Sequence, residues 1–119
     1  MQTKPIASIY SILEKIAYIE DNIRLHGSIH AALQDAKTTR PAILMFLAGI
    51  AEQFTKLKQK EAKEILSFFD TEELKGIQDI RNFIAHDYDG VELSIIEWML
   101  RYALPDLKEK CHKALQELT

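Results

Sequence analysis

The sequence predicts an all-α fold, an antiparallel bundle of four to five helices with short loops that occupies residues 1–119 as a single domain. Apolar residues recur at steps of three and four along most of the chain, which is the helical period, and we find no strand signal. Several Gly and Pro residues fall where the periodic segments begin and end. A chain of 119 residues can bury roughly two-thirds of its unfolded surface in one core.

The first helix is expected from Pro5 to Ile23. Pro5 suits a first helical turn, and Gly27 is placed to end the helix. Ser28 can then cap a short helix from Ile29 to Ala36. The apolar face of the first helix consists of Ile9, Ile12, Leu13, Ile16, Ile19 and Ile23. This spacing predicts one long amphipathic helix followed by a short one.

A second long helix is expected to begin within residues 38–41 and to run to about Lys58. Thr38 or Thr39 can cap it, and Pro41 lies inside its first turn. Its apolar stripe is wide enough for a central helix that packs on more than one neighbour. The stripe consists of Ile43, Leu44, Phe46, Leu47, Ile50, Ala51, Phe54 and Leu57.

A third long helix is expected after Asp70 and Thr71, either of which can cap it, and Glu73 lies in its first turn. Gly90 is expected to stop it as a left-handed C-terminal residue. The core-facing positions of this helix are Leu74, Ile77, Ile80 and Ile84.

The region from Leu93 to Leu104 is a heavily apolar helix, after which Pro105 is expected to kink or restart the chain. One narrow apolar face then continues to the C-terminus through Leu107, Cys111, Leu115 and Leu118. More large residues face outward between Leu93 and Leu104 than a lone monomer should expose. Part of this stripe is therefore expected to be covered by another subunit.

Composition restricts the class of protein. No apolar run approaches the roughly 20 residues that span a bilayer, and the first residues lack a secretory apolar block, so a cytosolic protein without membrane contact is expected. Cys111 is the only cysteine and is expected to be a small core residue. Gly27 and Ser28 separate His26 from His30, which favours two loop histidines over a metal pair. We find no phosphate-binding glycine loop and no zinc spacing, so no cofactor is expected.

The candidate functional residues lie in the segment from Arg81 to Tyr88. Asn82 and His86 are four residues apart and share a helical face, while Arg81 and Tyr88, seven apart, would lie one above the other if the helix persists that far. The segment Phe83-Ile84-Ala85 is expected to hold the helix against the core. Arg is a permanently charged fork that fits phosphate oxygens, and His exchanges protons near neutral pH. This combination suits RNA cleavage.

A purely structural interpretation of the same residues is also open. Arg81 could form an ion pair with Asp79 or Glu73, and His86 could stabilise the C-terminal end of its helix. The formal net charge of −3 counts against RNA binding through a broad basic surface. A cleft where two Arg81 side chains meet in a dimer could still be locally positive.

The segment resembles the signature of the HEPN superfamily, and more narrowly that of the HepT-like toxins, in which Arg is followed after four to six residues by His, any residue and Tyr. The resemblance extends upstream through residues 71–80. Downstream it includes Gly-Val-Glu-Leu at 90–93, Ile-Ile-Glu-Trp-Met-Leu at 95–100 and Leu-Pro-Asp-Leu at 104–107. The N-terminal half is similar only in its pattern of helices, and the Gly-Glu-Ala element of relatives is Ala51-Glu52-Gln53 here.

The resemblance implies a HEPN-like bundle and a metal-independent endoribonuclease, the toxin of a pair whose antitoxin is a small nucleotidyltransferase. Arg81 and His86 are then the catalytic residues, Asn82 and Tyr88 support them and position RNA, and Tyr88 is the hydroxyl that receives AMP. A homodimer with a shared cleft is expected, because one His86 per chain is few for acid and base work. The alternative function is a non-catalytic helical partner that presents substrate to a nucleotidyltransferase.

Overall fold

Helices account for every regular element of the chain that the structure describes. The computed structural model describes residues 3–119, and no strand occurs within that range. Four long helices form the bundle: α1 (Thr3–His26), α3 (Thr39–Gln59), α5 (Thr71–His86) and α7 (Leu104–Leu118). Between them lie α2 (Ile29–Gln34), α4 (Lys63–Leu66), the 3-10 turn η1 (Tyr88–Gly90), α6 (Leu93–Trp98) and the π-helical segment η2 (Met99–Ala103).

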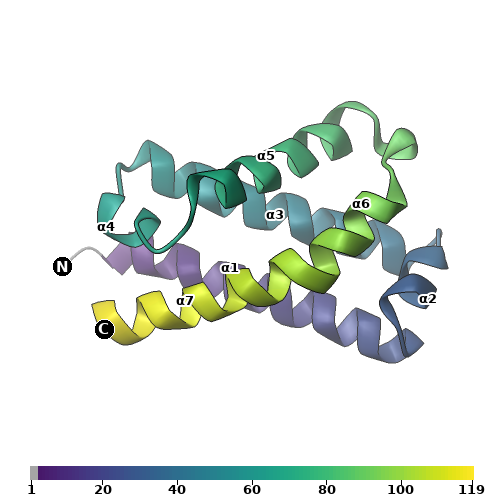
Figure 1. The fold of residues 1–119 in the computed structure, drawn as a ribbon, viewed down its shortest axis with the longest axis horizontal. Coiled ribbons are helices and arrows are strands. Elements are labelled where there is room, and N and C mark those ends of the chain that lie inside the picture. Colours follow the sequence, from purple (N-terminus) through teal and green to yellow (C-terminus); the bar gives the residue numbers. More distant parts are fainter. Residues whose placement is uncertain (1–2) are drawn as a thin grey trace.

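Successive long helices run in opposite directions, which gives an up-and-down arrangement (Figure 1). Helix α3 packs against both α1 and α5, and α7 packs against α1. The predicted antiparallel all-α bundle is therefore confirmed, and α3 is the central helix that its wide apolar stripe predicts.

Aliphatic side chains fill the core between the four long helices. Ile9, Ile12, Ile16 and Ile19 of α1 are almost completely buried, as their spacing predicts. Burying a side chain of this size stabilises a fold by about 1.5–3 kcal/mol. Cys111 of α7 is also fully buried, and burial raises the pKa of its thiol to about 12. The thiol is therefore protonated at neutral pH and serves as a small core residue.

The predicted signals at three helix ends are confirmed. Gly27 follows α1 with a left-handed φ of +84°. The hydroxyl of Ser28 accepts a hydrogen bond of 3.0 Å from the Ala31 amide at the start of α2. Asp70 and Glu73 form a capping box at the start of α5. These residues satisfy backbone groups that a helix end leaves without partners.

The start of α3 differs from the prediction. Thr38 occupies the capping position, but its hydroxyl makes no capping bond. The Asp35 carboxylate does this instead, accepting hydrogen bonds from the Thr39 amide at 3.1 Å and from the Thr39 hydroxyl at 2.9 Å. Asp35 leaves the helical conformation to reach Thr39, which is why α2 ends at Gln34 and not at Ala36.

Asp35→Asn should lower the thermal unfolding midpoint at neutral pH, because the amide caps α3 less well than a carboxylate. The hydrogen bonds from the Thr39 hydroxyl and backbone amide hold the pKa of Asp35 below its ordinary value. A depressed pKa gives stability that is present above about pH 4, the unfolded value, and is lost as the pH falls through the folded value. Melts monitored by circular dichroism should therefore converge for the two proteins in acid. Asp21→Asn, which removes an exposed pair with Arg24, is the control and should change little; a constant Asp35→Asn difference at all pH values would contradict the assignment.

Helices α6, η2 and α7 follow one another without a break, and η2 is a wider, π-helical turn. The π-helical segment Met99–Ala103 is separated from Pro105 by Leu104 alone, and Pro105 takes its place in the first turn of α7. A proline ring clashes with the carbonyl four residues earlier in an α-helix, and a π-turn relieves that clash. The predicted kink at Pro105 thus takes the form of a π-bulge.

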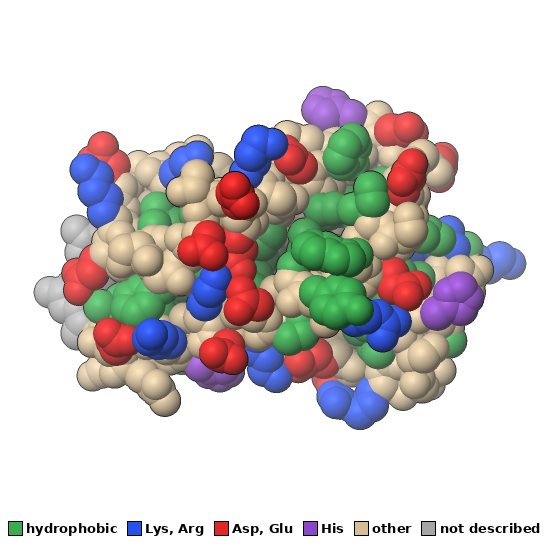
Figure 2. Space-filling view, in the orientation of Figure 1, with side chains coloured by type: hydrophobic (Ala, Val, Ile, Leu, Met, Phe, Trp, Pro, Cys, Tyr) green, Lys and Arg blue, Asp and Glu red, His purple; other side chains and the backbone are tan. Residues whose placement is uncertain are grey.

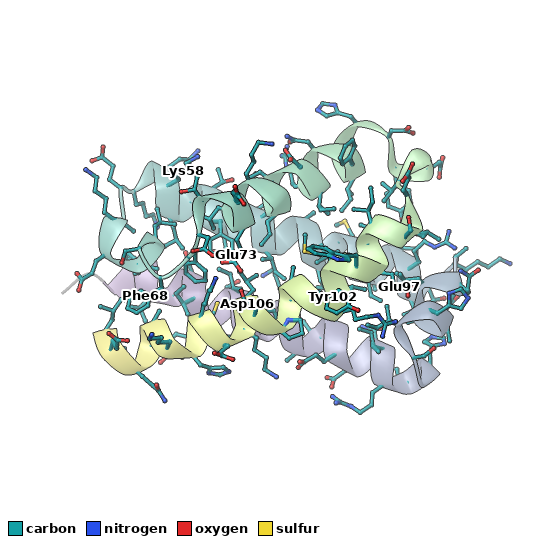
Figure 3. All side chains as sticks on the ribbon, viewed as in Figure 1. Lys58, Phe68, Glu73, Glu97, Tyr102 and Asp106 are labelled. Carbon is teal, nitrogen blue, oxygen red and sulfur yellow. The ribbon has the colours of Figure 1, made fainter. Side chains whose placement is uncertain are left out.

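Lys110 of α7 ties this helix to the start of α5. Its ammonium lies 3.0 Å from Glu73, 3.1 Å from Asp106 and 3.3 Å from Asp70. Glu73 and Asp106 approach each other across the gap between the two helices (Figure 3). Burial raises the pKa of Glu73, whereas the hydrogen bond from Lys110 lowers the pKa of Asp106. This contact fixes the end of α5 that is farther from the sequence motif.

Candidate functional site

Helix α5 carries three of the four predicted site residues. His86 is its last residue, and Asn82 lies one turn earlier. Both side chains are exposed, and their spacing of four places them on the outward face of α5, as predicted. Asn82 and His86 are thus a solvent-facing pair.

Arg81 turns toward the central helix. Its Nε donates to Glu52 Oε1 at 3.1 Å, and its Nη2 lies 3.0 Å from the same oxygen. Both structural partners proposed from the sequence are wrong, because Asp79 pairs with Lys75 and Glu73 binds Lys110. The Arg81–Glu52 pair is partly exposed, so it contributes little to stability. Its effect is to fix the direction of the guanidinium.

Arg81 and His86 do not project in the same direction. They are five residues apart, which turns their side chains about 140° from each other around α5. Arg81 also donates a long hydrogen bond of 3.5 Å from Nη1 to the side chain of Asn82. Asn82 therefore lies between the cation and the imidazole, and a ligand that reaches both must cross the outer surface of α5.

The expectation for the segment Phe83-Ile84-Ala85 is correct only for its middle residue. Ile84 is buried, whereas Ala85 is exposed and 57% of Phe83 is accessible to solvent. A helix turns about 100° per residue, so only one of three successive residues can point at the core line of Ile80 and Ile84. An exposed aromatic ring thus stands one turn before His86.

Tyr88 lies outside α5. The helix ends at His86, and Asp87 adopts an extended φ of −152°, so the helix does not persist to Tyr88 and the condition for Tyr88 to lie above Arg81 is not met. Tyr88 begins the 3-10 turn η1 and remains 40% exposed. Its hydroxyl is accessible beside the end of α5.

Gly90 is not the left-handed stop that the sequence predicts. The one glycine with positive φ among residues 3–119 is Gly27. The Asp87 carboxylate accepts a hydrogen bond from the Gly90 amide at 3.1 Å, and a Cβ at Gly90 would stand 2.0 Å from that carboxylate. Gly90 is therefore required by close approach of a side chain.

The sequence does not predict a functional role for two residues near the site. Glu52 is only a weak match to a family element, and its contact with Arg81 spans 29 positions. Phe83 is predicted to be a core residue, not an exposed one. The signal for Glu52 is its place on the polar side of the α3 stripe, facing away from Ile50 and Phe54.

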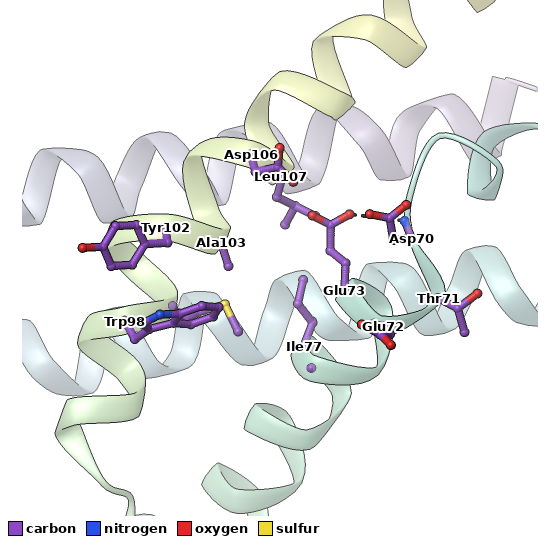
Figure 4. Close-up of a pocket in the computed structure, with 12 residues that line it drawn as sticks. Asp70, Thr71, Glu72, Glu73, Ile77, Trp98, Tyr102, Ala103, Asp106 and Leu107 are labelled. Carbon is purple, nitrogen blue, oxygen red and sulfur yellow. Dashed lines mark hydrogen bonds between the residues drawn. The ribbon is translucent and has the colours of Figure 1, made fainter.

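A wide groove lies between the first half of α5 and the segment Trp98–Leu107 (Figure 4). It has a volume of about 780 Å³, with Trp98 and Tyr102 on one side and Asp70, Glu73 and Asp106 near the other. Trp98 is 59% exposed and Tyr102 is 60% exposed. Figure 2 shows hydrophobic side chains gathered on this face, in agreement with the prediction that the stripe between Leu93 and Leu104 is incompletely covered.

Arg81, Asn82 and His86 thus lie at one exposed helix end of an all-α bundle, and Tyr88 lies just beyond it. Residues 12–114 match the family model described as Ribonuclease HepT-like, and the chain therefore belongs to the HepT-like family. Ribonuclease activity is the activity of that family. The chain has no significant match among curated proteins or among solved structures. None of the helices over residues 3–119 is long and apolar enough to cross a membrane.

Proposed function

We propose that this protein is a metal-independent endoribonuclease, the toxin of a pair whose antitoxin is a nucleotidyltransferase. The observation that carries the proposal is the presence of Arg81, Asn82 and His86 on the exposed part of α5 in a chain of the HepT-like ribonuclease family. Its substrate is RNA, since the reaction uses the ribose 2′-hydroxyl.

The proposed reaction needs proton transfer and a cation. His86 takes the proton of a 2′-hydroxyl, or gives one to the leaving 5′-oxygen, as the 2′-oxygen bonds to the adjacent phosphorus and the bond to the 5′-oxygen breaks. Arg81 stabilises the charge that develops on the phosphate oxygens. Asn82, held 3.5 Å from Arg81, orients His86 or a phosphate oxygen. The products are a 2′,3′-cyclic phosphate and a 5′-hydroxyl.

The purified protein should cleave RNA equally well with and without EDTA. His86 and Arg81 supply the proton transfer and the charge stabilisation that a metal would otherwise provide. Product ends can be identified by mass spectrometry, which distinguishes a cyclic phosphate from a linear phosphate. Cleavage that disappears with chelator and returns with added Mg²⁺ would refute the proposal.

The proposed active form is a two-fold homodimer whose motif helices face one cleft. The support is the divergence of Arg81 and His86 around α5 in one chain, together with the exposed aromatic side chains of Trp98 and Tyr102. In a two-fold dimer the same surface meets itself, so each subunit lends Arg81 and His86 to the shared cleft. Two arginines there would make a small positive site on a protein of net charge −3.

Tyr88 is the proposed target of the antitoxin. Transfer of AMP from ATP joins the Tyr88 oxygen to the α-phosphorus and releases pyrophosphate. Each AMP adds bulk and negative charge where an RNA phosphate must approach Arg81. The exposed ring of Tyr88 in η1, next to the end of α5, supports this role.

Co-expression with a nucleotidyltransferase encoded beside this chain should add whole AMP units to the protein, measured as intact mass and placed on Tyr88 by peptide analysis. The Tyr88→Phe variant should stay unmodified and active, and Tyr102→Phe, which alters another exposed tyrosine, should be modified normally. An unmodified wild-type protein that is nonetheless silenced would show that the antitoxin acts by binding alone.

A non-catalytic partner of a nucleotidyltransferase is the second candidate. The net charge of −3 and the engagement of Arg81 by Glu52 favour it. Under this alternative Arg81 and His86 bind a nucleotide, and RNA incubated with the protein stays intact at every protein concentration.

A further inference from the structure

A small pocket lies between the end of α5 and the start of α6. Its volume is about 260 Å³, and it is formed by Ile80, Phe83, Asp87, Gly90, Val91, Glu92, Ile95 and Ile96. This is slightly smaller than the roughly 300–1,000 Å³ of pockets that hold drug-sized ligands. The pocket is therefore suited to one flat ring system.

The pocket combines an apolar floor with an aromatic wall. Ile80 and Ile96 are buried at its base. Phe83 exposes 57% of its surface without covering a core neighbour. Phe83 and His86 are three residues apart on α5, which separates their Cβ atoms by about 5–6 Å. A ring stacked on Phe83 would thus lie next to the imidazole.

The negative charge of the residues that line the pocket disfavours a phosphate and favours a ligand group that donates hydrogen bonds. Two carboxylates, Asp87 and Glu92, line the pocket, and no Lys or Arg does. Asp87 is fixed by its hydrogen bond from the Gly90 amide. Glu92 is exposed and makes no capping hydrogen bond to α6, so its oxygens are free to accept from a ligand.

We infer that this pocket binds a single unpaired nucleobase of the RNA, next to the scissile phosphate, with Phe83 stacking on the base and Glu92 accepting its N–H groups. The inference rests on the proposed ribonuclease function and names the feature of RNA that the site selects. Proteins recognise single-stranded RNA by this combination of aromatic stacking and hydrogen bonds to base edges.

The carboxylate also determines which base fits. Guanine presents two adjacent donors, N1–H and the N2 amino group, which one carboxylate can accept together. Adenine and cytosine present one amino group beside an acceptor. Uracil presents N3–H between two carbonyl oxygens, which repel a carboxylate. The pocket should therefore prefer guanine and disfavour uracil.

The test uses short 2′-O-methyl oligonucleotides, which cannot be cleaved by 2′-hydroxyl attack, so that binding is measured independently of catalysis. An oligonucleotide with one guanine should bind about 10-fold more tightly than the same one with uracil, since the hydrogen bonds to the guanine edge are lost with uracil. Phe83→Ala should weaken the binding of both the guanine and the uracil oligonucleotide. Glu92→Gln should remove the preference for guanine over uracil. Tyr10→Ala and Glu14→Gln alter an exposed aromatic and an exposed carboxylate of α1 and should bind like wild type.

Cleavage of a random RNA pool, with the product ends sequenced, provides the second readout. The wild type should cut next to guanine, and Glu92→Gln should cut without that preference. Equal binding of guanine and uracil by the wild type, or an unchanged cutting pattern in both variants, would overturn the inference. If guanine is preferred in binding but no RNA is cut, the proposed catalysis fails and the base pocket stands. A Phe83→Ala variant that changes oligomeric state, measured by light scattering, would assign the pocket to a subunit contact.

Discussion

His86→Ala is expected to lower the rate of RNA cleavage by about 10²–10⁴-fold, the range that general acid–base catalysis contributes. Arg81→Ala should lower it by about 10²–10³-fold, because a preorganised cation no longer meets the charge that develops on phosphate. Both effects should appear mainly in kcat, since proton transfer and charge stabilisation act most strongly in the transition state. Single-turnover assays on a fluorescent RNA measure them directly.

Folding should be nearly unaffected in both variants. His86 is exposed at the end of α5, and the Arg81–Glu52 pair is partly exposed, so each substitution should change the free energy of unfolding by less than about 1 kcal/mol. His112→Ala, on the exposed side of α7, and Arg24→Ala, in an exposed pair with Asp21, are matched controls that should retain activity. A His86→Ala protein that is fully folded and fully active would remove His86 from the mechanism.

Arg81→Lys separates charge from shape. Lysine keeps the positive charge but lacks the planar fork that engages a phosphate through two parallel hydrogen bonds. It should restore only a small part of the lost rate. Glu52→Gln should instead leave the cation in place and loosen its direction, giving a loss smaller than that of Arg81→Ala.

The architecture was predictable because local patterns agree with the long-range packing. The three- and four-residue steps of Ile9, Ile12, Ile16 and Ile19 predict a buried face, and all four are buried. The caps at Ser28 and Asp70 depend on residues within three positions, so the sequence contains the whole motif. Helix ends were predicted wrongly where a side-chain hydrogen bond competes with the helix. For example, Asp35 leaves α2 to cap α3.

The sequence predicted which segment contains the candidate site, but not the contacts and directions of its side chains. The motif residues and the exposed pair Asn82 and His86 follow from spacing along one helix. The partner of Arg81 could not be deduced, because Glu52 lies on another helix 29 residues away. The end of α5 was misplaced because Asp87, and not Gly90, breaks the helix. That difference moves Tyr88 off the helix. Phe83 faces solvent for another reason, because Ile84 takes the core-facing position among residues 83–85.

Trp98→Glu is expected to convert a dimer into a monomer. Trp98 and Tyr102 form a tilted aromatic pair with ring centroids 5.9 Å apart, and both are more than half exposed in the single chain. Tryptophan and tyrosine are the residues most often found to dominate interface energy, with losses of about 2 kcal/mol or more on truncation. A glutamate adds the cost of burying an unpaired charge. The dissociation constant should therefore rise at least about 30-fold.

Light scattering at micromolar concentration should report a dimer for the wild type and a monomer for Trp98→Glu. Trp98 is the only tryptophan of the chain, so its emission provides a second measurement: it should shift to longer wavelength as the wild-type protein is diluted and the ring becomes exposed. Leu25→Glu, at an apolar residue that is 82% exposed near the end of α1, is the control and should remain dimeric. A wild-type protein that stays monomeric would refute the dimer.

Loss of the dimer should also abolish cleavage, although Trp98 lies outside the proposed contacts to RNA. The reason is the divergence of Arg81 and His86 around α5, which leaves one chain without a cation and an imidazole directed at one point. In a dimer, the second α5 across the two-fold axis would place its His86 opposite Arg81 of the first chain, and its Arg81 opposite His86. Cleavage by monomeric Trp98→Glu at the wild-type rate would show that one chain suffices and that RNA itself bridges the two sides of the helix.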